Sequence, residues 1–257
     1  MSIAFYKYQG TGNDFVLIDN RLGNFNKKNT KLVAAMCNRK FGIGADGLIL
    51  LENHPVVDFT MVYYNSDGNL SSMCGNGGRC VTHFAKYLKV IKDKAIFEAV
   101  DGMHHTIIQN DKISLGMNTV EKVSVFKNYV FLNTGSPHHV QIVSDSTKFD
   151  VFSEGRRLRN ELYGKEGANI NFVEQVGTNT FKVRTYERGV EDETLSCGTG
   201  VTAVAIAMHE IGKTTATSVF LETPGGVLEV QFQKAENGYK NIQLVGPAVQ
   251  VYKGIWS

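Results

Sequence analysis

Two cysteines in the sequence stand where a thiol could act as an acid or a base. Cys74 begins the segment Cys-Gly-Asn-Gly and Cys197 begins Cys-Gly-Thr-Gly, each ahead of apolar residues with helical spacing. A thiol at the N-terminus of a helix faces unpaired backbone N–H groups and the positive end of the helix dipole, which favour the thiolate. The glycines Gly75 and Gly198 let backbone amides approach a bound anion, so each segment could hold a carboxylate or an oxyanion.

A pair of such thiols has a specific chemical use. A thiolate can remove a proton from one face of a carbon atom while a thiol on the opposite face delivers another, which inverts the stereocentre. We therefore hypothesise that one of Cys74 and Cys197 is a thiolate and the other is a thiol. The amides of Asn76 and Thr199, together with those of the two glycines, would stabilise the negative charge that forms on the substrate.

The other two cysteines have a packing interpretation. Cys37 follows an apolar run, and Cys80 lies six residues after Cys74 within the same predicted helix, so it projects in another direction. A buried thiol of this kind behaves as a small hydrophobic side chain. The cysteines lack Cys-x-x-Cys spacing and a nearby pair of histidines, so we expect no metal site.

The elements that must position the two thiols come from an internal repeat. The segment 73–77 matches 196–200 at an offset of 123 residues, and 59–64 (FTMVYY) matches 181–186 (FKVRTY) at an offset of 122. Two further matches at 123 are Thr11-Gly12 with Thr134-Gly135, and the segment that begins at Ala45 with the segment that begins at Ala168. A nearly constant offset over almost half the chain predicts duplication of one structural unit.

The spacing after each cysteine predicts a helix. Apolar residues recur at positions i, i+3, i+4 and i+7 in both copies: Val81, Phe84, Ala85 and Leu88, and Val204, Ala207, Met208 and Ile211. The second helix, predicted over 201–211, is apolar on almost every side, so other structure should enclose it. Gly212 would end this helix.

Short apolar runs around these helices predict strands. They are rich in β-branched and aromatic residues and are bounded by Gly, Asn and Asp: 15–18, 48–51, 59–64, 181–186, 219–221 and 227–232. We expect a mixed α/β (α+β) fold of two pseudo-symmetric halves, each a curved, mostly antiparallel sheet around one central helix. The first half covers 1–118 and carries Cys74, and the second covers 119–257 and carries Cys197. The last residues, about 245–257 with Trp256, could return to the first half.

Composition excludes several classes of protein. The 257 residues are 42% hydrophobic and 20% charged, so neither disorder nor a collagen-like repeat is tenable. The formal net charge is +2, and no long block of one sign appears, so neither nucleic acid nor a membrane is an expected partner. Four cysteines in a chain of this length fit a reducing compartment, and we expect a cytoplasmic protein with a small-molecule substrate.

An ordered set of motifs resembles the diaminopimelate epimerase family. The motifs run from about residue 5 to 230: Gly10-Thr11-Gly12-Asn13-Asp14-Phe15, Gly42-Ile43-Gly44-Ala45-Asp46-Gly47, Met73 to Cys80, Glu187-Arg188-Gly189 and Cys197-Gly198-Thr199-Gly200. The resemblance implies two α/β halves with the site in the cleft between them. It also implies a reaction without pyridoxal phosphate or metal: epimerisation of LL-diaminopimelate to meso-diaminopimelate on the bacterial route to lysine and peptidoglycan. It is compatible with a homodimer.

The resemblance implies roles for individual residues. Cys74 and Cys197 are the catalytic pair, supported by His138 and Glu187. The implied substrate-binding residues are Asn13, Asn65, Gly75, Asn76, Asn171, Glu187, Arg188, Gly198 and Thr199. The alternatives are that the asparagines only cap turns, that Arg188 and Glu187 are solvated charges, and that His138 is a turn histidine.

Three positions depart from the family pattern. Gly47 stands where many members have a glutamine, so one substrate contact is absent or supplied elsewhere. Ser136 replaces a common asparagine before Pro137 and reaches less far. The loop 189–194 is longer and more acidic than usual, which could alter closure near Cys197.

Three other functions stay open at this point. A proline or hydroxyproline racemase would use the same thiol pair, but a cyclic imino acid has no distal group for Arg188 to hold. A thiol redox protein could join Cys74 and Cys197 in a reversible disulfide. An amino-acid binding module could use the two helix ends only to hold an anion.

Overall fold

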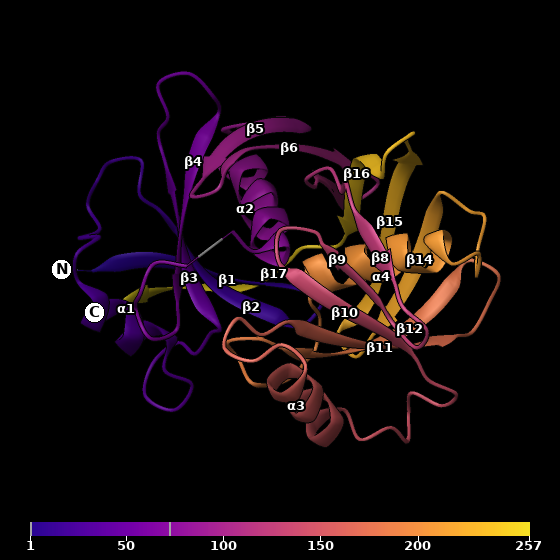
Figure 1. Cartoon of the computed structure of the whole chain (residues 1–257). Helices are drawn as coiled ribbons and strands as arrows, with labels where there is room; N and C mark the ends of the chain where they lie inside the picture. The colour runs from indigo at the N-terminus through magenta and orange to yellow at the C-terminus, as the bar shows by residue number, and fades with distance from the viewer. Residues whose placement is uncertain (1, 72) are drawn as a thin grey trace. The chain divides into compact units, whose positions relative to one another are not determined.

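The computed structural model describes residues 2–71 and 73–257, and the chain divides into two compact units. The first unit runs to Leu115 and also includes residues 246–257, and the second unit comprises residues 116–245. Figure 1 labels the elements of both units. Among the helices of the described ranges, none is both long and apolar enough to cross a bilayer.

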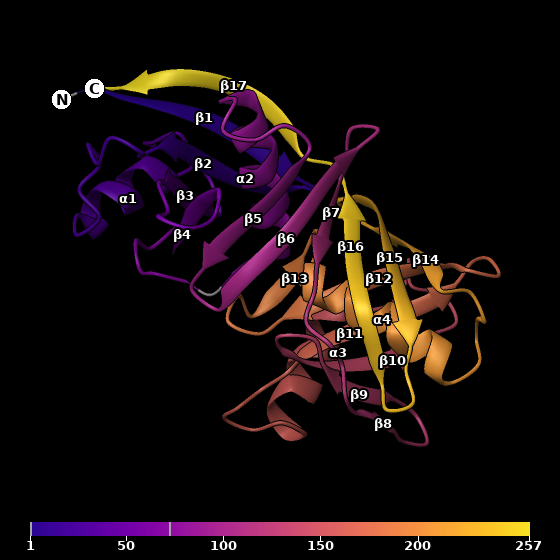
Figure 2. The ribbon, with the colours of Figure 1, turned by 90° about the horizontal axis from the view of Figure 1, so that it is seen from above.

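The first unit is a mixed sheet with two helices, α1 (Thr30–Cys37) and α2 (Gly75–Tyr87). Its strands are β1 (Ile3–Gly10), β2 (Asn13–Asp19), β3 (Gly47–Glu52), β4 (Phe59–Asn65), β5 (Lys94–Ala99), β6 (Gly102–Gln109), β7 (Lys112–Gly116) and β17 (Val249–Trp256). The pairs β2–β3 and β4–β5 are parallel, and the other pairs of this unit are antiparallel. The C-terminal strand β17 lies beside β1, as Figure 2 shows.

The second unit repeats this arrangement around α3 (Val151–Glu161) and α4 (Gly198–Glu210). Its strands are β8 (Val123–Val125), β9 (Val130–Asn133), β10 (Pro137–Ile142), β11 (Asn169–Gln175), β12 (Thr180–Glu187), β13 (Asp192–Thr194), β14 (Ser218–Thr223), β15 (Gly226–Lys234) and β16 (Tyr239–Gly246). Here β10–β11 and β12–β14 are the parallel pairs. They occupy the same places in chain order as β2–β3 and β4–β5, so the repeat in sequence is a repeat in structure.

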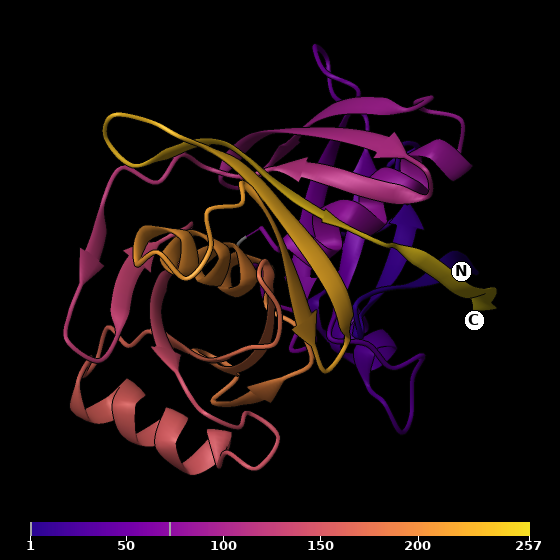
Figure 3. The same ribbon diagram turned by 90° about the vertical axis from the view of Figure 1, so that its right-hand side faces the viewer.

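The apolar helix α4 lies at the centre of the second unit. Its side chains from Val201 to Met208 are almost completely buried, and Figure 3 shows the strands of this unit curving around it. Helix α4 ends at Glu210, and Gly212, just beyond its C-cap residue Ile211, has a φ of +71°, a conformation that glycine adopts at little cost. The backbone N–H groups of Gly212 and Lys213 donate to the carbonyl oxygens of His209 and Met208, which satisfies the last turn.

Helix α2 is the corresponding helix of the first unit and approaches its sheet closely. A Cβ atom at Gly77 would lie 3.0 Å from Ile49 Cδ1 and 3.2 Å from Met61 Cε, so this glycine permits the close approach. The short helix α1 belongs to a separate cluster with the buried side chains of Val16 and Leu48. Strands β2 and β3 are thus covered on both faces, which explains their nearly continuous apolar sequences.

The structure confirms the mixed α/β class and all six predicted strands, with longer bounds. Both central helices begin earlier than the apolar spacing indicated, at Gly75 and at Gly198, because the first turn of each is made of small and polar residues. Helices α1 and α3 were not predicted from the sequence. Helix α1 has only eight residues, and α3 is mostly polar, so neither gives a strong apolar pattern.

Candidate functional site

One group of candidate site residues lies at the N-terminus of α2 in the first unit. Cys74 is the N-cap residue, with an extended backbone (φ −113°, ψ 124°), and its side chain does not cap the helix. Instead, its Sγ lies 3.4 Å from Oδ1 of Asn13, which begins β2. The N–H group of Gly78 donates to the carbonyl oxygen of Cys74, and the N–H groups before it belong to the open first turn. A thiol and a set of amide donors therefore occur together, as the sequence predicted.

Two asparagines and a buried arginine surround this thiol. Asn76 Nδ2 donates to Asn13 Oδ1 at 3.2 Å, and Arg79 Nη2 donates to Asn76 Oδ1 at 2.9 Å. Arg79 is completely buried, and its guanidinium also donates to Thr11 Oγ1 and to the carbonyl oxygen of Gly75. Burial lowers the pKa of Arg79.

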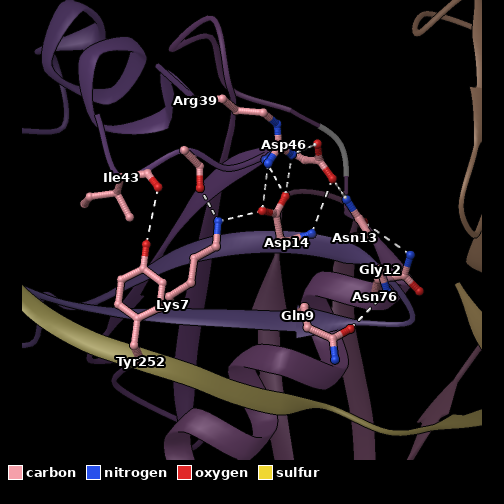
Figure 4. A network of polar contacts seen from close by, with 11 residues as sticks. Lys7, Gln9, Gly12, Asn13, Asp14, Arg39, Ile43, Asp46, Asn76 and Tyr252 are labelled. Carbon is pink, nitrogen blue, oxygen red and sulfur yellow. Dashed lines mark hydrogen bonds and ion pairs between the residues drawn. The ribbon is translucent and has the colours of Figure 1, made fainter. Parts of the chain in front are cut away.

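A cluster of four charged residues lies on the other side of Asn13 (Figure 4). Asn13 Nδ2 donates to Asp46 Oδ2 at 2.6 Å, and Arg39 bridges Asp46 and Asp14 at 2.7 Å each. Lys7 pairs with Asp14 at 2.6 Å and also donates to the carbonyl oxygen of Gly44. Burial alone would raise the pKa of Asp14, but its hydrogen bonds from Arg39 and Lys7 lower it to about 2. Sequence reasoning did not single out Lys7, Arg39, Asp14 or Asp46 as site residues.

Asn65 ends β4 on the same sheet face as Tyr63, two residues before it. Gly47 is the cross-strand partner of Asn65, and a Cβ atom at position 47 would lie 2.4 Å from Tyr63 Cε2 and from the Tyr64 carbonyl oxygen. The ring of Tyr63 makes an edge contact with Phe15 of β2. The first departure from the family pattern thus has a local cause: the space beside position 47 is filled by Tyr63.

A second group of candidate site residues lies at the N-terminus of α4 in the second unit. Cys197 is the N-cap residue there, with φ −119° and ψ 112°, so its backbone closely matches that of Cys74. Its Sγ lies 3.5 Å from the Thr199 hydroxyl. Thr134 Oγ1, in the loop before β10, donates to the carbonyl oxygen of Thr199 at 2.8 Å and ties this loop to the helix. A Cβ atom at Gly200 would lie 2.6 Å from Asn171 Oδ1 and 3.3 Å from the Cys197 sulfur.

Asn171 and His138 form a buried polar pair behind Cys197. Asn171 Nδ2 donates to the His139 carbonyl oxygen at 2.9 Å and to His138 Nδ1 at 3.2 Å, and Thr185 donates to Asn171 Oδ1. Both side chains are completely buried. Burial, with the nearby charge of Arg188, lowers the pKa of His138 to about 3, so the ring is neutral at physiological pH. Both ring nitrogens face an amide NH₂ group: Nδ1 lies 3.2 Å from Asn171 Nδ2, and Nε2 lies 3.5 Å from Asn169 Nδ2.

The side chain of Asn171 is hydrogen-bonded within the second unit, and its expected role in substrate binding stays a prediction. Asn169, which the sequence analysis passed over, accepts a hydrogen bond from the backbone N–H of Arg188 at 2.9 Å. A polar residue two positions before Asn171 on the same strand face was the available signal.

Glu187 and Arg188 lie at the end of β12. Glu187 is half-buried and accepts a hydrogen bond from the Thr194 hydroxyl at 2.9 Å. Arg188 is exposed, and its guanidinium donates to the Glu166 carbonyl oxygen at 2.9 Å. The expected roles of Glu187 and Arg188 stay predictions.

Ser136, the second position that departs from the family pattern, lies in the loop before β10. Its carbonyl oxygen accepts a hydrogen bond from the Thr134 N–H.

Two of the three acidic residues in the loop before Cys197 pair with arginines. Glu191 pairs with Arg159 of α3 at 3.0 Å, and Glu193 pairs with Arg184 of β12 through two hydrogen bonds of 2.6 Å. Residues 192–194 form β13, which is antiparallel to β12. These two ion pairs fix the loop to α3 and to β12 within the second unit.

The remaining cysteines lie in the core, as predicted. Burial raises the pKa of Cys37 and of Cys80 to about 12, so both stay thiols. Within the ranges 2–71 and 73–257, no three His, Cys, Asp or Glu side chains form a group that could hold a metal ion.

Comparison with known proteins gives a consistent result. A family model described as diaminopimelate epimerase matches residues 5–123 and 130–251. The chain is 60% identical to the diaminopimelate epimerase of Flavobacterium psychrophilum over 98% of this chain and 99% of that protein. Among solved structures, a PhzF-family phenazine biosynthesis protein from Bacillus anthracis has a TM-score of 0.81 at 14% identity, covering 100% of this chain and 99% of that one. A hydroxyproline epimerase from Agrobacterium vitis has a TM-score of 0.70 at 13% identity, covering 99% and 92%, and these two likenesses concern the fold alone.

Proposed function

The chain belongs to the diaminopimelate epimerase family, and we propose that it epimerises LL-diaminopimelate to meso-diaminopimelate with Cys74 and Cys197 as its acid–base pair. One observation carries the proposal: each sulfur stands at the N-cap of the central helix of its unit, with almost the same backbone conformation. The reaction belongs to the bacterial route to lysine and peptidoglycan.

The reaction requires two proton-transferring groups and stabilisation of the negative charge that forms on the substrate. The α-hydrogen of an amino acid is a very weak acid, so the negative charge that forms on its loss must be stabilised in the site. The first-turn N–H groups at Gly75 and Asn76, and those at Gly198 and Thr199, supply donors next to each sulfur. The thiolate of one cysteine removes the α-proton, and the thiol of the other cysteine donates a proton to the opposite face of the carbon. The two cysteines therefore exchange protonation states in each turnover.

Substrate recognition is assigned to the polar residues around the two thiols. Asn13 and Asn65 lie at strand ends of the first unit, and Glu187 and Arg188 lie at the end of β12 in the second. A guanidinium can hold the distal carboxylate with two parallel hydrogen bonds, which fixes the length of the substrate chain. His138 is neutral and buried, so we assign it to positioning and not to proton transfer.

The test is α-hydrogen exchange with LL-diaminopimelate in heavy water, for the wild type and for Cys74→Ala and Cys197→Ala. We expect epimerisation to fall by at least about a thousandfold in either variant, because inversion needs both proton carriers. Cys37→Ala is the matched control and should keep most of its turnover, since Cys37 is a buried thiol of the core. Near-normal turnover of Cys74→Ala would contradict the proposal.

The same measurement separates the other functions. A binding module would leave the α-position free of deuterium, and a proline or hydroxyproline racemase would exchange the α-hydrogen of the cyclic imino acid instead. A thiol redox protein would turn over dithiol substrates, whereas the epimerase needs only reduced thiols.

A further inference from the structure

The guanidinium of Arg79 is a buried positive charge whose hydrogen-bond partners are all neutral. The residue is 0% exposed and has the largest of the fully buried side chains in residues 2–71 and 73–257. Its guanidinium donates to Oγ1 of Thr11, Oδ1 of Asn76 and the carbonyl oxygens of Gly75 and Pro247, at 2.9 to 3.4 Å. Within those two ranges, no carboxylate forms an ion pair with Arg79.

This charge is permanent and uncompensated in the first unit. Burial lowers the pKa of Arg79, but a guanidinium keeps its proton at physiological pH. The charged cluster beside Asn13 supplies no spare negative charge, because its two cations and two carboxylates pair with one another (Figure 4). Cys80 stays a neutral thiol, since burial raises its pKa to about 12. A buried charge without an opposite charge is costly, so its presence needs an explanation.

The guanidinium contacts the first turn of α2, where the helix is open to a ligand. It donates to the carbonyl oxygen of Gly75 at 3.4 Å and to Asn76 Oδ1 at 2.9 Å. Because a guanidinium only donates, the Asn76 oxygen faces Arg79 and the Asn76 NH₂ group faces Asn13 Oδ1 at 3.2 Å. The charge of Arg79 therefore adds to the positive end of the helix dipole and to the open N–H groups of the same turn.

We propose that Arg79 is a positioning residue whose uncompensated charge draws a carboxylate to the first turn of α2 and holds Asn76 beside it. A carboxylate that binds there supplies the negative charge that Arg79 lacks, and their attraction is strong because the guanidinium is shielded from water. Arg79 is buried, so it acts through its field and through Asn76 and does not touch the ligand. This inference deepens the proposed function and rests on it for the identity of the ligand, which is the carboxylate next to the reacting carbon of diaminopimelate.

The test compares two alkylating reagents of nearly equal size at Cys74, without turnover. Iodoacetate carries a carboxylate and iodoacetamide is neutral, and both react with the same thiolate. Their rates are measured by mass spectrometry of the peptide that contains Cys74, in a Cys197→Ala background. The ratio of the two rates is therefore independent of the thiolate fraction and reports the attraction for a carboxylate. We expect this ratio to exceed that of free N-acetylcysteine by at least about threefold.

Three variants in the same background separate charge from packing. Arg79→Met removes the charge and keeps a long unbranched side chain, so the ratio should fall by at least about threefold. Arg79→Lys keeps the charge and should retain more than about half of the ratio of its parent. Thr82→Val is the matched control: Thr82 is buried on the same helix, where its hydroxyl donates to the Gly78 carbonyl oxygen at 2.8 Å. This variant loses a buried hydrogen bond but no charge, so its ratio should stay within about 1.5-fold of the parent.

The parent protein alone is enough to overturn the inference. A ratio at Cys74 no higher than that of N-acetylcysteine would do so even if thermal melting showed that Arg79→Met does not fold. Equal losses in Arg79→Met and Arg79→Lys would also overturn it, because the geometry of the guanidinium and not its charge would then be responsible. Neither reagent requires the epimerase reaction, so the outcome is distinguishable from failure of the heavy-water exchange assay.

Discussion

At the scale of single residues, the candidate site depends on buried polar side chains that no solvent reaches. Arg79, His138 and Asn171 are completely buried, and each makes hydrogen bonds within its own unit. A buried polar group left without such partners would cost on the order of 1–3 kcal/mol, so these residues fix their neighbours strongly. We expect these three residues to hold the loops and strand ends that carry the predicted site residues.

His138 should make stability depend on pH. Its pKa is lowered by burial to about 3 in the folded protein, against about 6.5 when unfolded, so the unfolded chain binds the extra proton between these values. Stability is therefore complete above pH 6.5 and is lost as pH falls toward 3. Between pH 7 and pH 5 we expect a loss of about 2 kcal/mol from this group.

The measurement is urea unfolding at pH 7 and pH 5 for the wild type and for His138→Gln. The variant should lose less stability over this interval, whatever its stability at pH 7. An identical pH dependence in both proteins would show that His138 titrates normally in the folded state. Burial also lowers the pKa of His139, to about 4. His139 is present in the wild type and in the variant, so it contributes equally to the pH dependence of both proteins.

Gly47 should not tolerate a side chain. A Cβ atom there would lie 2.4 Å from the Tyr63 ring and from the Tyr64 carbonyl oxygen, so the backbone of β4 must shift. We expect Gly47→Ala to destabilise the protein by about 1–3 kcal/mol and to reduce kcat/KM, because Asn65 is the cross-strand partner of Gly47. Chemical unfolding and steady-state kinetics check both effects, and an unchanged unfolding midpoint would argue against this packing.

At the scale of elements, each half-site depends on how closely a helix N-terminus approaches its sheet. Gly200 in the first turn of α4 leaves Asn171 room beside the Cys197 sulfur. Gly77 in α2 packs against Ile49 and Met61. Small residues in these first turns are thus packing requirements as well as a means to expose backbone N–H groups to substrate.

Gly200→Ala should damage the second half-site specifically. Its Cβ would lie 2.6 Å from Asn171 Oδ1, so either Asn171 or the helix must move, and the sulfur of Cys197 at 3.3 Å moves with it. We expect a loss of kcat of about tenfold or more, since small displacements of reacting groups are costly. Gly177→Ala is the control: it meets only Thr180 at 3.3 Å, and its stability should change by less than about 1 kcal/mol. Equal kinetics for the two variants would contradict this assignment.

At the scale of the whole molecule, the chain builds one unit, then the second, and returns to the first. Strand β17 pairs with β1 along its length, and the Pro247 carbonyl oxygen accepts a hydrogen bond from the buried Arg79. Gln250 of β17 also accepts one from the buried Tyr8. The C-terminus therefore stabilises the unit that carries Cys74 and contributes directly to the surroundings of that site.

Truncation after Ala248 should loosen the first unit selectively. Removing β17 exposes the edge of β1, so amide hydrogens of residues 3–10 should exchange faster, while those of α4 should keep their protection. Hydrogen exchange followed by mass spectrometry checks the prediction by unit. Equal loss of protection in both units would mean that they unfold as one cooperative body.

Much of this fold could be predicted from the sequence. The six strand runs and the apolar spacing of the two central helices are local patterns that burial dictates. The repeat and its two Cys-Gly-x-Gly segments were found from matching residues 122–123 positions apart. Helices α1 and α3 were missed because a short helix and a polar helix leave little periodic signal. The hydrogen bond between Asp46 and Asn13 was not predicted, because the two residues are brought together only by the folded sheet.

The sequence by itself determined that two similar units carry equivalent cysteines at helix N-termini. The duplication is visible as matching residues 122–123 positions apart, and the helix signals lie in consecutive residues. Only the tertiary structure decided which side chains meet near each cysteine. Asn13 and Asp46, for example, are 33 residues apart in the sequence but share a hydrogen bond. That meeting requires the parallel pairing of β2 with β3, which is a long-range property of the folded sheet.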